Sequence, residues 1–421
     1  MEKIVVFLLI VFTPVFALPQ DANYDESKVP DFKLPELMRL KNGRKVKNAI
    51  NWMKDRRPEI LADFENEMYG IIPGVLEISG TQVLEEDKNV FSGKATRRQV
   101  RLFFSSGHKK VKIDVLLYIP NLSKPVPVFL GLNFSGNQAV CNDPDILITD
   151  SWVINNESLG ITDHRATEQS RGGKAHRWQV EKLIEEGFAL ATTCCGDIDP
   201  DRDDFTDGVH PFLCREGQEK PAPEEWGTIA AWAWGLSRIL DYLENLDNID
   251  SEKVIVLGHS RLGKTALWAG ASDNRFAAVI SNNSGCGGAA LSRRAFGETV
   301  ERINRSFPHW FCDNFVKYGN NESALPVDQH MLIALIAPRP VYIASASEDQ
   351  WADPKGEYLS GFYASEVYKL FGFEGLKSPE QPPANTPVIK RVSYHIREGK
   401  HDITGYDWDQ YIRFAKLYVL N

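Results

Sequence analysis

The sequence lacks several features that mark particular classes of protein. After residue 12, no uninterrupted apolar stretch approaches the roughly 20 residues that a membrane helix needs. The basic residues are scattered and the formal net charge is -9, so no basic surface for a nucleic acid is indicated. Internal repeats and low-complexity tracts are also absent. We therefore expect no membrane partner, no nucleic-acid partner and no repeat architecture.

Cysteine is scarce, with six residues at positions 141, 194, 195, 214, 286 and 312. No two of them have the C-x-x-C spacing of a zinc ribbon, so a structural zinc site is not indicated. An oxidising compartment would permit disulfides, but the sequence does not choose among the possible pairings.

The longest apolar run lies at the start of the chain. It extends from Ile4 to Phe12 after Lys3, and Val15 and Ala17 are placed like the small residues of a cleavage site. We therefore predict a signal peptide over residues 1–17 and a secreted or periplasmic protein.

The rest of the chain has the composition of a globular protein, with 43% hydrophobic and 25% charged residues. An amphipathic pattern from Ala49 to Glu67 predicts a helical cover. From about residue 75 to 120 the residues alternate as in antiparallel strands, most clearly over 98–104 and 110–118.

Beyond residue 120, short apolar runs alternate with helical patterns, which is typical of a mostly parallel sheet with crossover helices. A helix is predicted over Thr228 to Leu246, before the third strand of this region. The predicted strands are Val126 to Leu132, Phe188 to Thr193, Val254 to Leu257, Ala277 to Ile280, Val341 to Ala344 and Arg391 to Ile396.

The segment from Lys253 to Trp268 indicates the chemistry. A strand pattern ends at Gly258, a helical pattern begins after Ser260, and the serine lies on the turn between them. This is the context of a nucleophile elbow, in which the helix N-terminus directs amide hydrogens toward developing negative charge. The motif here is G-x-S-x-x-G, because Leu262 replaces the usual second glycine. The alternative is a serine that only caps a helix.

A serine nucleophile needs a base that is itself oriented by a carboxylate. In the α/β-hydrolase fold the chain order is serine, acid, histidine. Asp349 follows one predicted strand and His401 follows the last, so order and location both fit. The sequence therefore predicts an α/β protein of the α/β-hydrolase fold, a three-layer αβα sandwich around a mostly parallel sheet, with one catalytic domain over residues 18–421.

Each of these two assignments has competitors. Glu348 is adjacent to Asp349 and is the second candidate for the acid. For the base, His395 lies inside a predicted strand and His259 adjoins the nucleophile in the turn, so His401 is preferred.

The segment Gly258-His259-Ser260-Arg261-Leu262-Gly263-Lys264 resembles the G-x-S-R-x-G-K motif of the glucuronoyl esterases, carbohydrate esterase family 15. The similarity extends over most of the chain. Further blocks that are similar to bacterial members are residues 195–201, 208–211, 283–288 and 348–354.

The resemblance implies hydrolysis of the ester that joins 4-O-methyl-glucuronic acid of xylan to lignin alcohols, through an acyl-enzyme and without a metal or organic cofactor. It assigns Arg261 to the oxyanion hole, and Lys264, Glu298 and Trp351 to the sugar. A guanidinium can stabilise an oxyanion, and an indole offers a flat apolar face to a pyranose. We expect a monomer whose partner is the glucuronoxylan-lignin ester.

One departure from the family pattern concerns the acid. Many members place the triad glutamate in the loop after the strand that follows the nucleophile, and Asn283 stands there in this chain. An amide carries no charge to stabilise an imidazolium, so Asp349 is the natural replacement.

Alternative functions remain on the same scaffold. One is another carbohydrate esterase, such as an acetylxylan esterase, which would use the same Ser260. Another is a hydrolase-fold carbohydrate-binding protein without turnover, which Asn283 favours. A peptidase is less favoured because no propeller repeats or accessory domain are visible.

Overall fold

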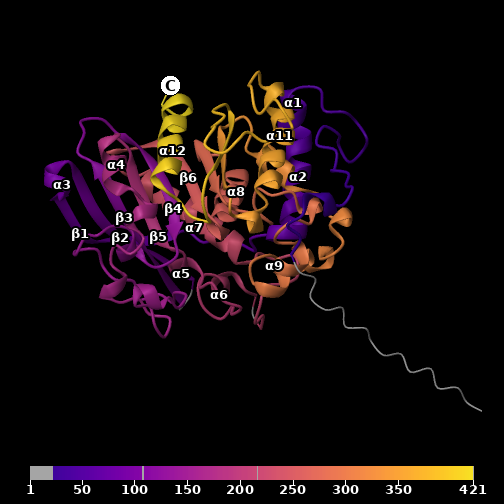
Figure 1. Cartoon of the computed structure of the whole chain (residues 1–421). Coiled ribbons are helices and arrows are strands. Elements are labelled where there is room, and N and C mark those ends of the chain that lie inside the picture. Colours follow the sequence, from indigo (N-terminus) through magenta and orange to yellow (C-terminus); the bar gives the residue numbers. More distant parts are fainter. Residues whose placement is uncertain (1–21, 107–108, 216, 421) are drawn as a thin grey trace, which may run out of the picture.

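The computed structural model describes residues 22–106, 109–215 and 217–420 (Figure 1). The predicted signal peptide lies outside these residues. Within them, nine strands form one sheet in the order β1-β2-β3-β5-β4-β6-β7-β8-β9. The strands are β1 (Ile78–Asn89), β2 (Ala95–Ser106), β3 (Lys109–Pro120), β4 (Val126–Asn133), β5 (Ala189–Cys194), β6 (Ile249–His259), β7 (Ala278–Asn282), β8 (Val341–Ala346) and β9 (Val392–Arg397).

The sheet has an antiparallel and a parallel part. Strands β1, β2 and β3 pair antiparallel, and β3 joins β5 in the same sense. From β5 to β9 all neighbours are parallel. Strands β5, β7, β8 and β9 are buried at every residue, which explains their nearly continuous apolar sequences. The six predicted strands of this region agree with the structure to within a few residues, apart from an earlier start for β6.

Helices cover both faces of the sheet, and alternate strand residues enter two separate hydrophobic cores. On β4, for example, Val128 and Leu130 contribute to one core and Phe129 to the other. Helices α7, α8, α10 and α11 pack in the first core, and α4 and α12 in the second. This confirms the predicted three-layer α/β-hydrolase architecture.

The helices of the described residues are mostly short, and none of them is long and apolar enough to cross a bilayer. They are α1 (Ala49–Asn51), α2 (Arg57–Phe64), α3 (Val90–Gly93), α4 (Val180–Glu185), α5 (Cys195–Ile198), α6 (His210–Leu213), α7 (Thr228–Leu243), α8 (Arg261–Ser272), α9 (Val300–Ser306), α10 (Gln329–Leu335), α11 (Pro354–Leu370) and α12 (Gly405–Tyr418).

The N-terminal helical stretch lies on the opposite side of the molecule from β1 (Figure 1). It runs from α1 into α2 with two π-helical turns, η2 (Trp52–Arg56) and η3 (Glu65–Tyr69), so it is less regular than the single helix expected. Arg57 fastens it to the sheet-covering helices by donating to the carbonyls of Ala271 (2.6 Å) and Leu335 (3.0 Å). The Tyr69 ring stacks on Trp268 at 4.3 Å. The cover thus supports α8, which follows the candidate nucleophile.

Candidate active site

Ser260 lies on a sharp turn between β6 and α8. Its backbone has φ 59° and ψ -128°, a strained conformation for a residue other than glycine. A Cβ atom on Gly258 would lie 1.8 Å from the carbonyl oxygen of Leu262, so only glycine fits there. The N–H of Ser260 donates to the carbonyl of Asn282 at 2.9 Å, which ties the turn to β7. The turn has the geometry of a nucleophile elbow, as the sequence predicts.

His401 and Asp349 meet at the carboxyl ends of β8 and β9. The Nδ1 atom of His401 lies 2.6 Å from Oδ2 of Asp349. The carboxylate is buried, whereas the imidazole is 39% exposed and accessible to a substrate. Glu348 is exposed on the surface. The structure therefore brings Asp349, and not its neighbour, to the histidine.

Ser260, Arg261 and His401 line two cavities, one of about 310 Å³ and the other of about 300 Å³. We call them the first and the second cavity. Because the hydroxyl, the guanidinium and the imidazole border both, the candidate reaction centre lies where the two cavities meet.

Asn283 supports Asp349, the candidate acid, through a hydrogen bond. Its backbone has φ 48°, and its N–H donates to the carbonyl of Ala344 at 2.7 Å. Its Nδ2 donates to Oδ2 of Asp349 at 2.8 Å. One carboxylate oxygen therefore accepts from Asn283 and faces the imidazole of His401 as well.

The rival histidines are buried in the protein. His259 lies beside Asn282, with 2.6 Å between Nδ1 and Oδ1, and His395 lies beside Asp407, with 2.9 Å between Nε2 and Oδ1. Burial lowers the pKa of His395, and burial followed by the charge of His401 lowers the pKa of His259. Their surroundings thus favour neutral, structural imidazoles.

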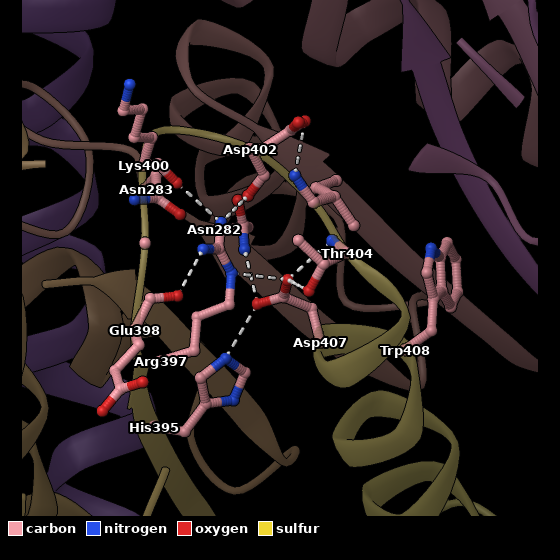
Figure 2. Close-up of polar contacts among 12 residues, drawn as sticks. Asn282, Asn283, His395, Arg397, Glu398, Lys400, Asp402, Thr404, Asp407 and Trp408 are labelled. Carbon is pink, nitrogen blue, oxygen red and sulfur yellow. Dashed lines mark hydrogen bonds and ion pairs between the residues drawn. The ribbon is translucent and has the colours of Figure 1, made fainter. Parts of the chain in front are cut away.

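Arg397 holds the loop that carries His401. Its guanidinium donates to three backbone carbonyls around the histidine, as Figure 2 shows. They belong to Glu398 (3.1 Å), Lys400 (2.8 Å) and Asp402 (2.6 Å). These bonds fix the path of the loop on both sides of the imidazole.

Asp407 in turn holds Arg397, by accepting from its Nε at 2.8 Å (Figure 2). The same oxygen accepts from the N–H and the hydroxyl of Thr404, at 2.7 and 2.8 Å. Burial opposes its ionisation, but the hydrogen bond with His395 and the nearby positive charges keep the pKa of Asp407 below its usual value. Sequence reasoning missed this support, although the capping-box pattern Thr404-x-x-Asp407 is visible.

The guanidinium of Arg261 is held beside Ser260 by a buried carboxylate, Asp201. It also lies 5.0 Å from the Trp310 ring. Asp201 accepts from Nε1 of Trp310 at 2.7 Å and faces Nε2 of His309 at 3.0 Å. Although burial opposes ionisation, these hydrogen bonds and the Arg261 charge hold the pKa of Asp201 below its usual value. A fixed positive charge therefore lies beside the hydroxyl of Ser260 at the candidate reaction centre.

Lys264 and Glu298 are both buried beside the second cavity. The ammonium of Lys264 donates to the carbonyls of Ser284 (2.6 Å) and Cys286 (2.5 Å) and lies 3.5 Å from Glu298. Burial raises the pKa of Glu298, against the opposing charge of Lys264. Three protein acceptors surround the ammonium, so Lys264 positions the wall of the second cavity. Glu298 is better placed than Lys264 to contact a ligand.

Trp351 completes the second cavity. Its side chain is 37% exposed, and the Arg302 guanidinium lies 5.2 Å from its ring. Its carbonyl accepts from the N–H of Glu298 at 3.0 Å. All the side chains that the sequence proposed for the sugar and the oxyanion therefore gather at one cavity with Ser260.

Glu357, on α11, is a further site residue that the sequence does not indicate. It accepts from the N–H groups of Ser284 (2.7 Å) and Gly285 (3.0 Å) and from the hydroxyl of Ser345 (2.6 Å). It thereby holds the loop that follows Asn283. Burial, with the Asp349 charge as a smaller cause, raises the pKa of Glu357 to about 8.

The cysteines near these segments are thiols. Cys141, Cys194, Cys195, Cys286 and Cys312 are free in the described structure. Cys286 contributes its backbone carbonyl to Lys264, and burial raises the pKa of its thiol. Its role beside the second cavity is therefore structural.

The fold and the elbow define an α/β-hydrolase. The chain is 51% identical over 403 residues to "Carbohydrate esterase MZ0003" from an unknown prokaryotic organism, which covers 95% of this chain and 93% of that protein. The structure of a promiscuous CE15 esterase from a marine bacterial metagenome matches with a TM-score of 0.89 and 50% identity, over 94% of this chain and 100% of that one. A glucuronoyl esterase from Solibacter usitatus matches with a TM-score of 0.87 and 47% identity, over 93% and 99% of the chains.

The family model described as "Glucuronyl esterase, fungi" matches residues 221–372, which include Ser260 and Asp349. The chain therefore belongs to carbohydrate esterase family 15, the glucuronoyl esterases, and it is a carboxylic ester hydrolase. The family resemblance that the motif around Ser260 indicates is confirmed.

The hydrogen bonds from Arg397 to the loop that carries His401 lead to a first prediction. We expect Arg397→Met to lower kcat by about 100-fold, because a misplacement of roughly 1 Å at a reacting group has an effect of that order. It should also lower the free energy of unfolding by about 3 kcal/mol, since Asp407 loses its buried partner. Ester hydrolysis and thermal unfolding measure the two effects. Arg413→Met, at an exposed position of α12, is the control. Normal kcat in folded Arg397→Met protein would contradict the positioning role.

Glu357 leads to a prediction about pH. Because its pKa is about 8 in the folded protein and 4.5 is its usual value, the folded state holds the proton more tightly. The resulting stabilisation is complete below pH 4.5 and is lost as the pH rises through 8. Glu357→Gln cannot ionise, so its Tm relative to the wild type should increase between pH 5 and 8. Glu366→Gln, exposed on the same helix, should show no such trend. A constant difference in Tm for Glu357→Gln would refute the raised pKa.

Proposed function

We propose that this esterase hydrolyses the ester between 4-O-methyl-glucuronic acid of xylan and lignin alcohols, with Ser260 as nucleophile, His401 as base and Asp349 as acid. The observation that carries this proposal is the 2.6 Å approach of His401 Nδ1 to Asp349 Oδ2, beside a cavity that Ser260 and His401 both line. The substrate class follows from membership of the glucuronoyl esterases.

In the acylation step, Oγ of Ser260 attacks the ester carbonyl while Nε2 of His401 takes the hydroxyl proton. The carbonyl oxygen becomes an oxyanion, which the Arg261 guanidinium and the amides at the start of α8 stabilise. The C–O bond to the alcohol then breaks, and His401 returns the proton to the departing alcohol oxygen. The product is a glucuronoyl ester on Ser260.

In deacylation, water replaces Ser260 as the nucleophile and Oγ of Ser260 becomes the leaving group. His401 removes a proton from a water molecule, whose oxygen attacks the acyl carbon. The bond between the acyl carbon and Oγ of Ser260 then breaks, and His401 gives its proton to Oγ. The glucuronic acid is released. Through both steps Asp349 accepts from Nδ1–H, which fixes the tautomer and stabilises the imidazolium.

The second cavity provides the site for the sugar. Glu298 can accept hydrogen bonds from sugar hydroxyls, Trp351 offers an apolar face to the ring, and Lys264 keeps Glu298 in place. The cavity of about 300 Å³ lies in the range of small-molecule sites.

The organisation of the chain belongs to the same proposal. Residues 18–421 form a single catalytic domain with an N-terminal helical cover, supported by the contacts of Arg57 with α8 and α10. A signal peptide over residues 1–17 exports the protein, which acts as a secreted or periplasmic monomer.

A paired-substrate assay tests the function. The wild type should cleave a benzyl ester of glucuronic acid far faster than an aryl acetate, and Ser260→Ala should cleave neither. A preference for the acetate would identify an acetylxylan esterase or a related enzyme. Binding of the glucuronate ester without turnover would identify a carbohydrate-binding protein that has lost activity.

A further inference from the structure

The first cavity is not explained by the sugar. It shares Ser260, Arg261 and His401 with the second cavity, but none of the residues proposed to contact the sugar lines it. An ester has two sides, and the reaction centre lies where the cavities meet. If the second cavity receives the acyl group, the alcohol is left to occupy the first.

We infer that the first cavity is the binding site for the alcohol of the ester, and that it selects aromatic alcohols that carry a negative charge. This inference rests on the proposed function, because it takes the sugar to occupy the second cavity. It adds a subsite with a charge preference to that function.

The apolar lining explains the preference for an aromatic ring. The cavity has a volume of about 310 Å³. A dry apolar cavity of roughly half that volume, about 150 Å³, binds benzene. The apolar side chains in its wall include Phe134, Val140, Trp178, Leu257 and Ile403. Methanol would leave this surface in contact with water, whereas a benzyl or phenylpropyl group would cover it.

Two cations in the wall explain the preference for an anion. Arg177 pairs with Asp402 at 2.5 Å, but within the described ranges no carboxylate lies within ion-pair distance of Lys174. Burial, followed by the charge of Arg177, lowers the pKa of Lys174. The charge of Asp402 opposes this effect, but Asp402 is also the partner of Arg177, so the two cations share one carboxylate. A carboxylate on the alcohol would balance the second cation.

The cavity walls are tied together, so the site is preformed. The segment with Lys174 and the loop that follows β4 are joined by two backbone hydrogen bonds. Lys174 N–H donates to the carbonyl of Ala139 at 2.9 Å, and Gly172 N–H donates to that of Gln138 at 2.8 Å. Ile154 lies at the exposed rim, where its side chain is 44% accessible. A ligand can therefore enter without unfolding of the wall.

Four esters of glucuronic acid test the inference on the wild type: methyl, benzyl, 4-carboxybenzyl and 4-(aminomethyl)benzyl. All four form the same acyl-enzyme, so the alcohol affects kcat/KM through acylation alone. We expect kcat/KM for benzyl to exceed that for methyl by about tenfold to 100-fold, the range that apolar contacts provide. The kcat/KM for the 4-carboxybenzyl ester should exceed that for the 4-(aminomethyl)benzyl ester by about threefold to tenfold, the effect of a partly exposed ion pair.

Two variants with matched controls locate the effect. Lys174→Met should abolish the preference for the carboxybenzyl ester, whereas Lys124→Met, at an exposed site outside the cavity, should keep it. Ile154→Asp should lower the benzyl-to-methyl ratio by about tenfold. Leu147→Asp, at a residue 47% exposed and also outside the cavity, should leave that ratio unchanged.

The outcomes separate the two proposals. Equal kcat/KM for methyl and benzyl esters, or a charge preference that survives Lys174→Met, would overturn the inference and leave the proposed function standing. A wild type that cleaves none of the four esters would overturn both.

Discussion

Ser260→Ala is expected to lower kcat for a glucuronate ester by a factor on the order of 10⁵ to 10⁶, as removal of the nucleophile does in other serine hydrolases. The hydroxyl lies on a strained elbow at the junction of two cavities, and the other residues that line both cavities are Arg261 and His401. His401→Ala should have an effect of similar size, because the hydroxyl is a poor nucleophile without a base. Steady-state hydrolysis of the benzyl ester measures both losses.

Two controls make this prediction specific. Since nucleophile and base act as one unit, Ser260→Ala combined with His401→Ala should be no slower than either single variant. Ser272→Ala, at the far end of the same helix, should keep normal kcat. Substrate binding and Tm of Ser260→Ala should also remain near the wild type. Activity of Ser260→Ala within tenfold of the wild type would exclude Ser260 as the nucleophile.

The site could be predicted from the sequence where its signals are local. The strand, the glycine and the helix around Ser260 are contiguous, so their pattern indicates the elbow directly. Asp349 and His401 lie far apart in the chain, but each follows a buried apolar strand. Parallel strands bring their carboxyl ends to one edge of the sheet, which explains why order along the chain was sufficient.

Strand β1 shows where local patterns fail in the fold. Its residues include Glu85, Glu86 and Asp87, and none of its side chains is buried. As an edge strand it pairs on one side only, and charged side chains are typical of such positions. The alternation from residue 75 to 120 predicts β structure there but does not define this strand.

The supporting residues of the site could not be predicted for a different reason. Glu357 stands in a helix where a glutamate is ordinarily exposed, and only the tertiary fold places it under the loop after Asn283. Asp201 and Arg261 are 60 positions apart, and nothing in either segment indicates their ion pair. Such contacts depend on how loops from different strands meet.

The second prediction with a large effect concerns the acid. Asp349→Asn is expected to lower kcat by about 10⁴-fold, the loss that this change causes in an established serine protease triad. The amide keeps the shape of the carboxylate but removes the charge that stabilises the imidazolium of His401. The buried position increases the effect, because little water reaches Asp349 to compensate.

Substitutions at neighbouring residues test whether the charge of Asp349 is the cause of the lower kcat. Glu348→Gln should change kcat less than threefold, because its side chain is exposed. Asn283→Ala removes one hydrogen bond to Asp349 and should cost about tenfold at most, the equivalent of roughly 1.4 kcal/mol. Measurement of kcat with the benzyl ester ranks the three variants. Near-normal turnover of Asp349→Asn together with a large loss in Glu348→Gln would transfer the acid role to Glu348, and the 2.6 Å contact with His401 would then be structural only.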